Sequence, residues 1–268
     1  DQERRREELL ERQKKKRRDM TELARQLEQT HVGDEQTMEE DLGSDESGME
    51  MAKTTRIERK VQAEERRKTF YANQLMLPEF LSEVPSDLTS NWLCLPYPLN
   101  SIRCLIISSA GITSCRDSNG VLLDRFPSAL PNGSNFIRGG SRGSYCILDC
   151  AFHPDSQTFF VLDMMAWKGN LYYDCPTDFR WYWMHTKLAE TDSSTLSKHN
   201  KYRFVPVPYF PCDPNGIASA LHRGLAVPLH GLLFYNKQTD YTPGTTPLVC
   251  GLPLELIEPT LSEFFTPQ

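Results

Sequence analysis

The stretch 145–188 constrains the fold more than any other part of the chain, because it concentrates large apolar and aromatic side chains. An apolar run at 145–148 leads to a turn at 153–156 that contains Pro, Asp and Ser, and a second apolar run follows at 158–162. Two runs rich in β-branched and aromatic residues around such a turn predict a β-hairpin. A dense aromatic segment then covers 171–183, and only a packed core shields so many rings from water. The stretch therefore predicts the centre of a sheet, with Trp167, Trp181 and Trp183 in the core.

The charges divide this chain of 268 residues into three parts. Residues 1–27 hold ten Lys or Arg and seven Asp or Glu, and residues 28–51 hold nine acids and no Lys or Arg. From residue 52 onward twenty acids balance twenty bases. With 39% hydrophobic residues the chain has enough apolar side chains for a sizeable core. This pattern predicts a basic and an acidic segment ahead of one globular body.

Several classes of protein are excluded by the composition. The eight cysteines form no CxxC pair and lie in apolar runs, which disfavours a zinc site or a disulfide framework and favours buried free thiols. No apolar run approaches the roughly 20 residues of a membrane span, and no signal peptide is recognisable. Because the chain begins without Met, we expect a fragment of a longer protein.

The basic segment 1–28 contains no Gly or Pro and consists of good helix formers. Four of its apolar residues, Met20, Leu23, Ala24 and Leu27, follow the spacing i, i+3, i+4, i+7 and form one narrow stripe. This helix is either a solvated charged helix or short coiled coil, or an arm that docks by charge into an acidic groove of a partner. A nucleic-acid-binding arm is a third, weaker alternative, because acids are interspersed among the bases.

The remaining chain divides into three parts. Residues 29–66 predict an acidic disordered linker, although its last part favours a short polar helix. Residues 67–250 form the body, and residues 251–268 form a C-terminal tail. The body begins with an expected helix at 71–81 that Pro78 interrupts. After it the sequence predicts strands at 92–95, 103–108, 112–115, 121–123, 203–207, 230–235 and 247–249, together with the hairpin and a helix at 215–223. Antiparallel sheets with a few helices make an α+β domain.

Three blocks of the body, YANQLMLPEFLSEVPSDL, ILDCAFHPDSQTFFVLDMMAWKGNLYYDCPTDFRWYWMHTKL and GLLFYNKQTDYTPGTTPLV, resemble the snurportin family. That family consists of nuclear import adaptors. The resemblance implies that the body binds the 5′ trimethylguanosine cap of small nuclear RNAs and their ribonucleoproteins. It also implies that the protein shuttles between cytoplasm and nucleus, and that an export receptor of the exportin class is a further partner.

Residues 1–28 are similar to the helical part of the family's importin-β-binding domain, whose preceding extended segment is missing here. The resemblance assigns importin-β binding to the basic residues Arg4, Arg5, Arg6, Lys14, Lys15, Lys16, Arg17 and Arg18.

The family's cap-binding domain is similar in fold to the nucleotide-binding domain of messenger-RNA guanylyltransferases. Those enzymes need a Lys-x-Asp-Gly motif, because its lysine amine attacks the α-phosphate. The corresponding stretch 107–112 has neither Lys nor Asp, and His230 stands where an acidic residue would help hold a metal. We therefore expect a binding protein without catalytic residues, metal or cofactor.

Within the family, the cap contacts come from four segments of the domain. Carried over to this sequence, the cap-binding positions are Leu77, Pro78, Phe80, Ser101, Ile102, Arg103, Ser118 and Gly251. A methylated guanine carries positive charge and favours an aromatic face, whereas the triphosphate favours cations. Phe80 keeps an aromatic face for the base, and Arg103 keeps a positive charge for the phosphates.

Three cap-binding positions depart from the family pattern. Pro78 replaces a serine, so it retains only a carbonyl and a ring for contact. Ser118 replaces a phosphate-facing lysine, which leaves Arg116 as the nearest cation. Gly251 replaces a stacking tryptophan, and losing one stacked ring costs on the order of 1–3 kcal/mol. The alternative function is therefore a protein-interaction module of the same fold that has lost its cap affinity, and an active nucleotidyltransferase is a third, opposed by the missing lysine.

Overall fold

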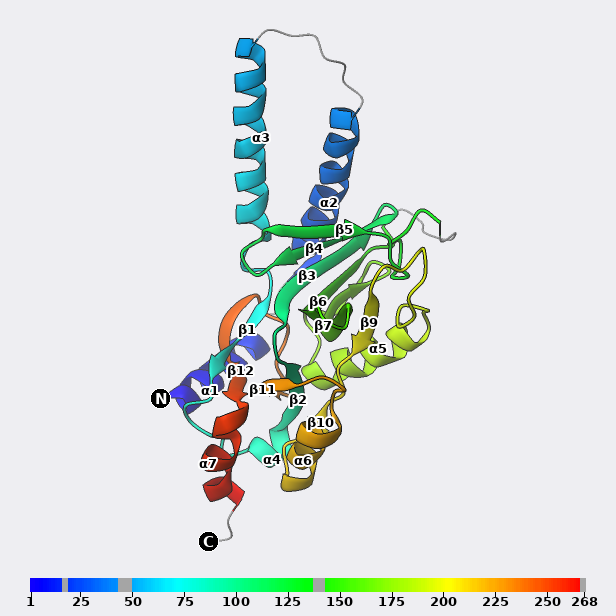
Figure 1. The fold of residues 1–268 in the computed structure, drawn as a ribbon. Coiled ribbons are helices and arrows are strands. Elements are labelled where there is room, and N and C mark those ends of the chain that lie inside the picture. Colours follow the sequence, from blue (N-terminus) through cyan, green and yellow to red (C-terminus); the bar gives the residue numbers. More distant parts are fainter. Residues whose placement is uncertain (16–18, 43–49, 137–142, 266–268) are drawn as a thin grey trace.

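The computed structural model describes residues 1–15, 19–42, 50–136 and 143–265. Two β-sheets form the centre of the molecule, and in Figure 1 one lies above the other. The lower sheet has the strand order β1-β12-β11-β2-β10 and is antiparallel except for the parallel pair of β1 and β12. Its strands are β1 (Met76–Phe80), β2 (Trp92–Pro98), β10 (Phe210–Pro211), β11 (Leu229–Asn236) and β12 (Gly244–Pro253).

The upper sheet has the order β5-β4-β3-β6-β7-β8, and β9 pairs in parallel with β7. Its centre is the expected hairpin of β6 and β7, in which every residue of β7 is buried. The strands are β3 (Ile102–Ser109), β4 (Ile112–Asp117), β5 (Leu122–Phe126), β6 (Cys146–His153), β7 (Thr158–Trp167), β8 (Asn170–Leu171) and β9 (Arg203–Pro206). The prediction of an α+β fold with antiparallel sheets is confirmed.

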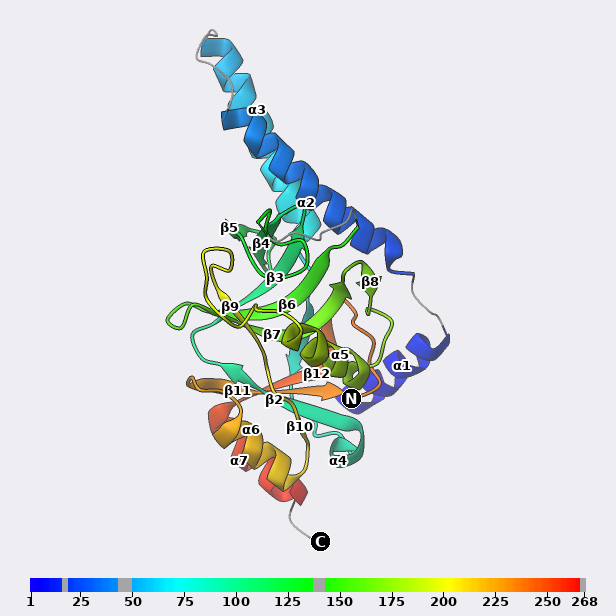
Figure 2. The ribbon, with the colours of Figure 1, turned by 90° about the vertical axis from the view of Figure 1, so that its right-hand side faces the viewer.

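Seven helices of the described residues surround the sheets. In Figures 1 and 2, α2 and α3 project beyond the upper sheet, α5 lies along that sheet, and α6 and α7 lie beneath the lower sheet. The helices are α1 (Gln2–Lys15), α2 (Thr21–Leu42), α3 (Glu50–Tyr71), α4 (Leu88–Asn91), α5 (Thr177–Ala189), α6 (Pro214–Arg223) and α7 (Leu254–Phe265).

Two apolar clusters form the core. The larger one joins both sheets, and it includes Ile106 of β3, Leu148 of β6 and Tyr235 of β11. The smaller one lies between the lower sheet and the helices beneath it, and it includes Phe234 of β11, Ile217 of α6 and Ile257 of α7. The lower sheet is therefore covered by apolar side chains on both faces.

The aromatic segment after the hairpin was expected to extend the sheet, and this expectation is wrong. Residues 177–189 form α5, whose buried side chains include Arg180, Trp181, Met184 and Leu188. Their spacing i, i+1, i+4, i+8 is that of one helix face. Aromatic composition favoured a strand, but the spacing of these apolar residues describes an amphipathic helix lying on β7 and β9. Trp167 and Trp181 are buried as predicted, and Trp183 is half-buried against the core.

The helix expected at 71–81 is also a misassignment, because α3 ends at Tyr71 and Met76 begins strand β1. Pro78 is accommodated because β1 is the edge strand of its sheet, and the register shifts between Pro78 and Glu79. Edge strands and bulges are the positions where a sheet tolerates proline.

The N-terminal part is more helical than the sequence predicts. The single helix expected at 1–28 is divided into α1 and α2, and helix continues through 29–42 and 50–66, where a disordered linker was expected. Residues 29–42 contain no proline and a single glycine, Gly33, so propensity permits the helix. His31 of α2 is buried between Ser114 and Ser109, so tertiary contacts hold the helix in place.

The C-terminal segment 251–268 was expected to be a tail. Its first three residues complete β12, and α7 packs Ile257 and Leu261 into the smaller apolar cluster.

All eight cysteines are free, and seven are buried, as predicted. Among the described residues, no helix is long and apolar enough to cross a membrane, and no group of His, Cys, Asp or Glu is arranged to hold a metal ion.

Candidate functional site

A cavity of about 350 Å³ opens on the lower sheet at its contact with β3. Five of the eight expected cap-binding residues line it: Leu77, Pro78, Phe80, Arg103 and Gly251. The other lining residues are Glu79, Tyr97, His230, Gly231, Leu232, Leu233, Leu252 and Pro253. Cavities of this size take small ligands, typically with a few polar groups among apolar walls.

The parallel pairing of β1 with β12 brings sequence-distant residues together at this cavity. Phe80 is the pairing partner of Gly251, and the amide of Leu81 donates a hydrogen bond of 3.0 Å to the Gly251 carbonyl. A Cβ atom on Gly251 would lie 3.4 Å from Leu233 Cδ2 and 3.7 Å from Pro78 Cβ. A Cβ atom would therefore fit beside the proline ring at ordinary contact distances, whereas the Phe80 ring is exposed at the rim.

Arg103 provides the fixed positive charge of the cavity. Its Nε donates to Asp149 Oδ1 at 2.5 Å and its Nη2 to Asp149 Oδ2 at 2.7 Å, and Nη2 also donates to the Met76 carbonyl at 3.1 Å. Nη1 has no hydrogen bond to any residue that the structure describes. The guanidinium is thus held rigidly by one edge while one nitrogen is left for a ligand.

Asp149 connects three strands around the Arg103 guanidinium. Besides the arginine it accepts a hydrogen bond of 2.8 Å from Tyr241 Oη, and that hydroxyl in turn accepts from the Met76 amide at 2.9 Å. Burial raises the pKa of Asp149, and the hydrogen bonds donated by Arg103 and Tyr241 oppose this rise. The network fixes the start of β1 against β3 and β6.

The other three expected cap residues do not line the cavity. Ser101 donates to the Pro98 carbonyl at 2.8 Å, and Ile102 is exposed at the start of β3. Ser118 lies in the turn between β4 and β5, where its carbonyl accepts from Asn73. Their role in cap binding stays a prediction.

Arg116 does not replace the missing phosphate-facing lysine. It is 2% exposed, donates to the Gly120 carbonyl at 2.9 Å and lies 4.1 Å from the centre of the Tyr71 ring. The side chain is enclosed between α3 and the turn, so it is not available to a ligand phosphate.

Sequence reasoning missed three polar or aromatic lining residues. Glu79 lies between two expected residues on β1, and Tyr97 and His230 form an edge-to-face pair with ring centres 6.3 Å apart. Glu79 was recognisable from its position between Pro78 and Phe80. His230 was singled out only as the residue at a metal-holding position of the related enzymes, and Tyr97 carried no signal, because the contact between the two depends on the pairing of β2 with β11.

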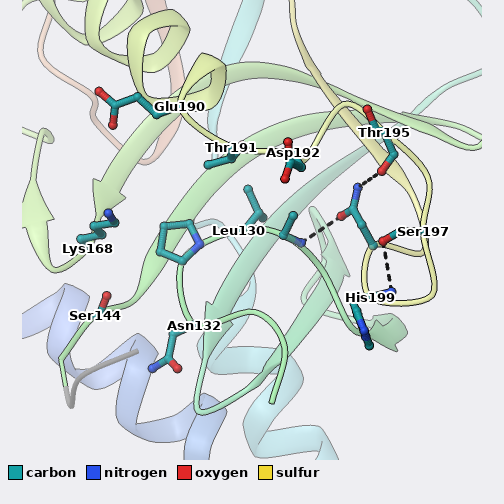
Figure 3. Close-up of a pocket in the computed structure, with 13 residues that line it drawn as sticks. Leu130, Asn132, Ser144, Lys168, Glu190, Thr191, Asp192, Thr195, Ser197 and His199 are labelled. Atoms are coloured by element: carbon teal, nitrogen blue, oxygen red, sulfur yellow. Dashed lines mark hydrogen bonds between the residues drawn. The ribbon is translucent and has the colours of Figure 1, made fainter. Parts of the chain in front are cut away.

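A second cavity of about 770 Å³ lies between the loop after β5 and the loop after α5. Figure 3 shows polar side chains around it, among them Lys168, Glu190, Asp192 and His199. Asn200 holds the two loops together, since its side chain accepts from the Ala129 amide at 3.0 Å and donates to the Thr195 carbonyl at 2.9 Å. None of the expected cap residues lines this larger cavity.

The stretch 107–112 forms the end of β3 and the turn into β4. Ser108 donates to the Pro131 carbonyl at 2.7 Å, and Ser109 donates to Glu28 of α2 at 3.0 Å. Both hydroxyls are thus engaged by neighbouring segments.

The residues expected to bind importin-β have different surroundings. Arg4, Lys14 and Lys15 are exposed on α1, whereas Arg5 and Arg6 contact the body. The remaining three, Lys16, Arg17 and Arg18, lie outside the described residues.

A family model described as "Snurportin1, m3G cap-binding domain" matches residues 74–253, and this confirms the resemblance found in the sequence. Solved DNA ligases are similar at low identity. A mycobacterial DNA ligase D complexed with ATP and MES has a TM-score of 0.45 and 13% identity, covering 67% of this chain and 60% of the ligase chain. The ligase domain of M. tuberculosis LigD has a TM-score of 0.46 and 13% identity, with 68% and 61% covered. The chain thus spans about three fifths of the length of these two ligase chains.

Proposed function

The chain belongs to the snurportin family, and on that basis we propose that it is a nuclear import adaptor that binds the 5′ trimethylguanosine cap in the cavity beside Gly251. The observation that carries this proposal is the convergence of Leu77, Pro78, Phe80, Arg103 and Gly251, from three strands, on one cavity. In this function the body binds capped small nuclear RNA or its ribonucleoprotein, and the basic arm links it to importin-β. The protein would then move between cytoplasm and nucleus, with an export receptor of the exportin class as a further partner.

The chemistry of the cavity suits the base of such a cap. A methylated guanine is cationic, and the exposed face of Phe80 offers it an aromatic surface. The Glu79 carboxylate lies in the same wall, where Arg5 of α1 pairs with both of its oxygens. Leu77, Leu233 and the ring of Pro78 supply the apolar contacts that cap methyl groups need.

The phosphates of the cap have fewer partners than in the family pattern. Arg103 retains one nitrogen for them, whereas Ser118 and the enclosed Arg116 provide no cation at the cavity. We therefore expect the affinity to depend mainly on the base, and to respond weakly to salt.

The proposed function is binding without catalysis. Covalent nucleotidyl transfer needs a lysine nucleophile, and the stretch 107–112 offers only hydroxyls, already engaged by Pro131 and by Glu28 of α2. Incubation with labelled GTP should leave no covalent nucleotide on the protein.

Titration with trimethylated and monomethylated cap dinucleotides tests the cap proposal, with tryptophan fluorescence as the readout. We expect tighter binding of the trimethylated cap. Equal or undetectable affinity for both caps would contradict the proposal. It would favour the second candidate, a protein-interaction module without cap affinity, which the absence of an aromatic side chain at Gly251 supports.

The importin-β linkage has a separate test. Replacing the five basic residues 14–18 with glutamine should weaken binding to importin-β and reduce its dependence on salt, because charge pairs between exposed groups are screened. An unchanged salt dependence would contradict docking by charge.

A further inference from the structure

Helix α1 lies against the body with one polar face. Gln2, Arg6, Leu9 and Gln13 follow the spacing i, i+4, i+7, i+11 of a single helix face. At its start, Gln2 Nε2 donates to the Phe80 carbonyl at 3.0 Å. Near its end, Gln13 donates to the Gln238 carbonyl at 2.7 Å and accepts from the Asp240 amide at 2.8 Å. The helix is therefore fixed at both ends, and it lies beside β12 (Figure 2).

Arg6 lies at the centre of this contact and is 3% exposed. It donates to the carbonyls of Pro247 and Glu83 at 3.1 and 2.8 Å, and its guanidinium carbon lies 5.2 Å from the centre of the Trp92 ring. Hydrogen bonds in which the donor is charged are stronger than neutral ones. A basic residue expected to bind a partner protein is thus buried in this chain's own body.

Two glutamates of the body complete the surface that receives α1. Glu79 accepts two hydrogen bonds from Arg5, at 2.6 and 2.8 Å, and the pKa of Glu79 is lowered chiefly by this contact. The Glu83 carboxylate accepts from the backbone amides of Gln2 and Glu3 at 2.8 and 3.1 Å. Those amides are unpaired donors at a helix start, and a carboxylate there also stabilises the helix dipole.

Helix α2 is held by the body as well. Part of its apolar stripe is buried at the contact with β3, where Ala24 and Leu27 are 0% exposed, whereas Met20 and Leu23 are partly buried against the core. One turn further, His31 Nε2 lies 3.3 Å from the Ser109 carbonyl, which can only accept, so Nε2 carries the proton and Nδ1 accepts from Ser114 at 3.0 Å. Two charged residues of the arm, Arg5 and Arg6, and part of its apolar stripe are therefore engaged within the molecule.

We propose that the body carries an intramolecular receptor for the arm, and that this closed arrangement excludes importin-β. This inference rests on the proposed import function. Arg5, Arg6 and Leu27 cannot contact the body and a second protein at the same time, so importin-β binds only the fraction of molecules whose arm has detached. The apparent affinity is reduced by that fraction, and variants that loosen the receptor raise it.

The test uses the full chain with two substitutions on the receiving side, Glu83→Ala and Ser114→Ala. Neither residue lines the cap cavity or belongs to the arm. The matched control, Glu258→Ala, removes an exposed glutamate of α7. The importin-β dissociation constant is measured for each protein, and hydrogen exchange of residues 3–13 and 22–31 reports whether the arm is docked.

We expect the double variant to bind importin-β about fivefold to tenfold more tightly than the unchanged chain, with faster exchange in both helices. The control should match the unchanged chain in both measurements. Equal dissociation constants for the double variant and the unchanged chain would overturn the inference while leaving the import function intact. Absence of importin-β binding in every protein would overturn the import function and this inference together.

Discussion

Two buried arginine–aspartate pairs are built on neighbouring aspartates of the upper sheet, and they have different surroundings. Asp149 of β6 and Asp163 of β7 are cross-strand partners, and each accepts a bidentate contact from its own arginine, Arg103 or Arg180. Arg180 and Asp163 are both 0% exposed, whereas Arg103 is 10% exposed and lines the cavity.

The remaining hydrogen bonds of the two arginines explain this difference. Besides Asp163, Arg180 donates to the carbonyls of Cys175 and Thr239 at 2.6 and 2.8 Å, so all its nitrogens are bound within the protein. Arg103 leaves Nη1 without a partner among the described residues. The Arg180–Asp163 pair therefore fixes α5 and the segment after β11. The Arg103–Asp149 pair, which has the same two residue types, presents a charge to a ligand.

Substitution of Arg180 should have the largest effect on stability. Arg180→Met leaves the buried Asp163 without its counter-charge, which typically costs about 3–5 kcal/mol in the free energy of unfolding. Urea unfolding measures this loss. Adding Asp163→Leu should recover much of the stability, because an apolar pair of similar volume avoids the unpaired charge. A loss below about 1 kcal/mol for the single variant would contradict the scaffold role.

His31 sharpens the comparison, because it is a buried basic group that no carboxylate of the described residues pairs with. Burial, followed by repulsion from Arg125, lowers the pKa of His31 from 6.5 to about 4. At a pH above 6.5, the pKa of His31 in the unfolded chain, His31 is neutral in both the folded and the unfolded state. Its contribution to stability is then fully present. As pH falls from 6.5 towards 4, the unfolded state binds a proton that the folded state does not, so stability is lost, up to about 3 kcal/mol.

Unfolding free energies between pH 7 and pH 4 measure this effect, with His31→Gln as the control that cannot titrate. The difference between the two proteins should change across this interval, and hydrogen exchange of α2 should accelerate. A constant difference would show that His31 keeps an ordinary pKa.

Substitution of Arg103 should reduce stability less than substitution of Arg180, and it should also reduce cap affinity. In Arg103→Met, the buried Asp149 keeps the hydrogen bond from the Tyr241 hydroxyl, so we expect a loss of about 3 kcal/mol in unfolding free energy, the lower end of the range for a broken buried pair. Arg103→Lys keeps the charge but loses the bidentate contact, and should retain part of the cap affinity. If both variants bind the cap like the unchanged chain, Arg103 is as purely structural as Arg180.

Phe80→Ala should have the smallest effect on stability, because the ring is 55% exposed. Its expected effect is on the ligand alone, a loss of about 1–3 kcal/mol in cap affinity from the missing stacking surface. The exposed ring of α5, Tyr182, provides the matched control, since Tyr182→Ala removes an aromatic far from the cavity. Equal cap affinities in the two variants would show that the methylated guanine of the cap does not stack on Phe80.

The sequence predicted the strands better than the contacts between them. Apolar runs and turn residues indicated β6, β7 and most other strands. The aromatic composition of α5 led to its assignment as part of a sheet, and β1, which contains Pro78, was assigned to an interrupted helix. Cap residues on β1, β3 and β12 came from family resemblance, because a sheet pairs strands that are far apart in sequence. Docking of α1 was not predictable, since its buried face is polar and hydrophobic periodicity does not detect it.

The central claim is that the cavity beside Gly251 receives the cap, and restoring an aromatic ring there tests it most directly. The Cβ position of Gly251 meets only contacts of ordinary length, so Gly251→Trp should fold and provide a stacking surface. The account predicts that trimethylated cap dinucleotide binds about tenfold or more tightly to this variant, equivalent to about 1.4 kcal/mol. As a control, Leu123→Trp on β5 should leave the affinity unchanged. Unchanged or weaker cap binding in a folded Gly251→Trp variant would contradict the account.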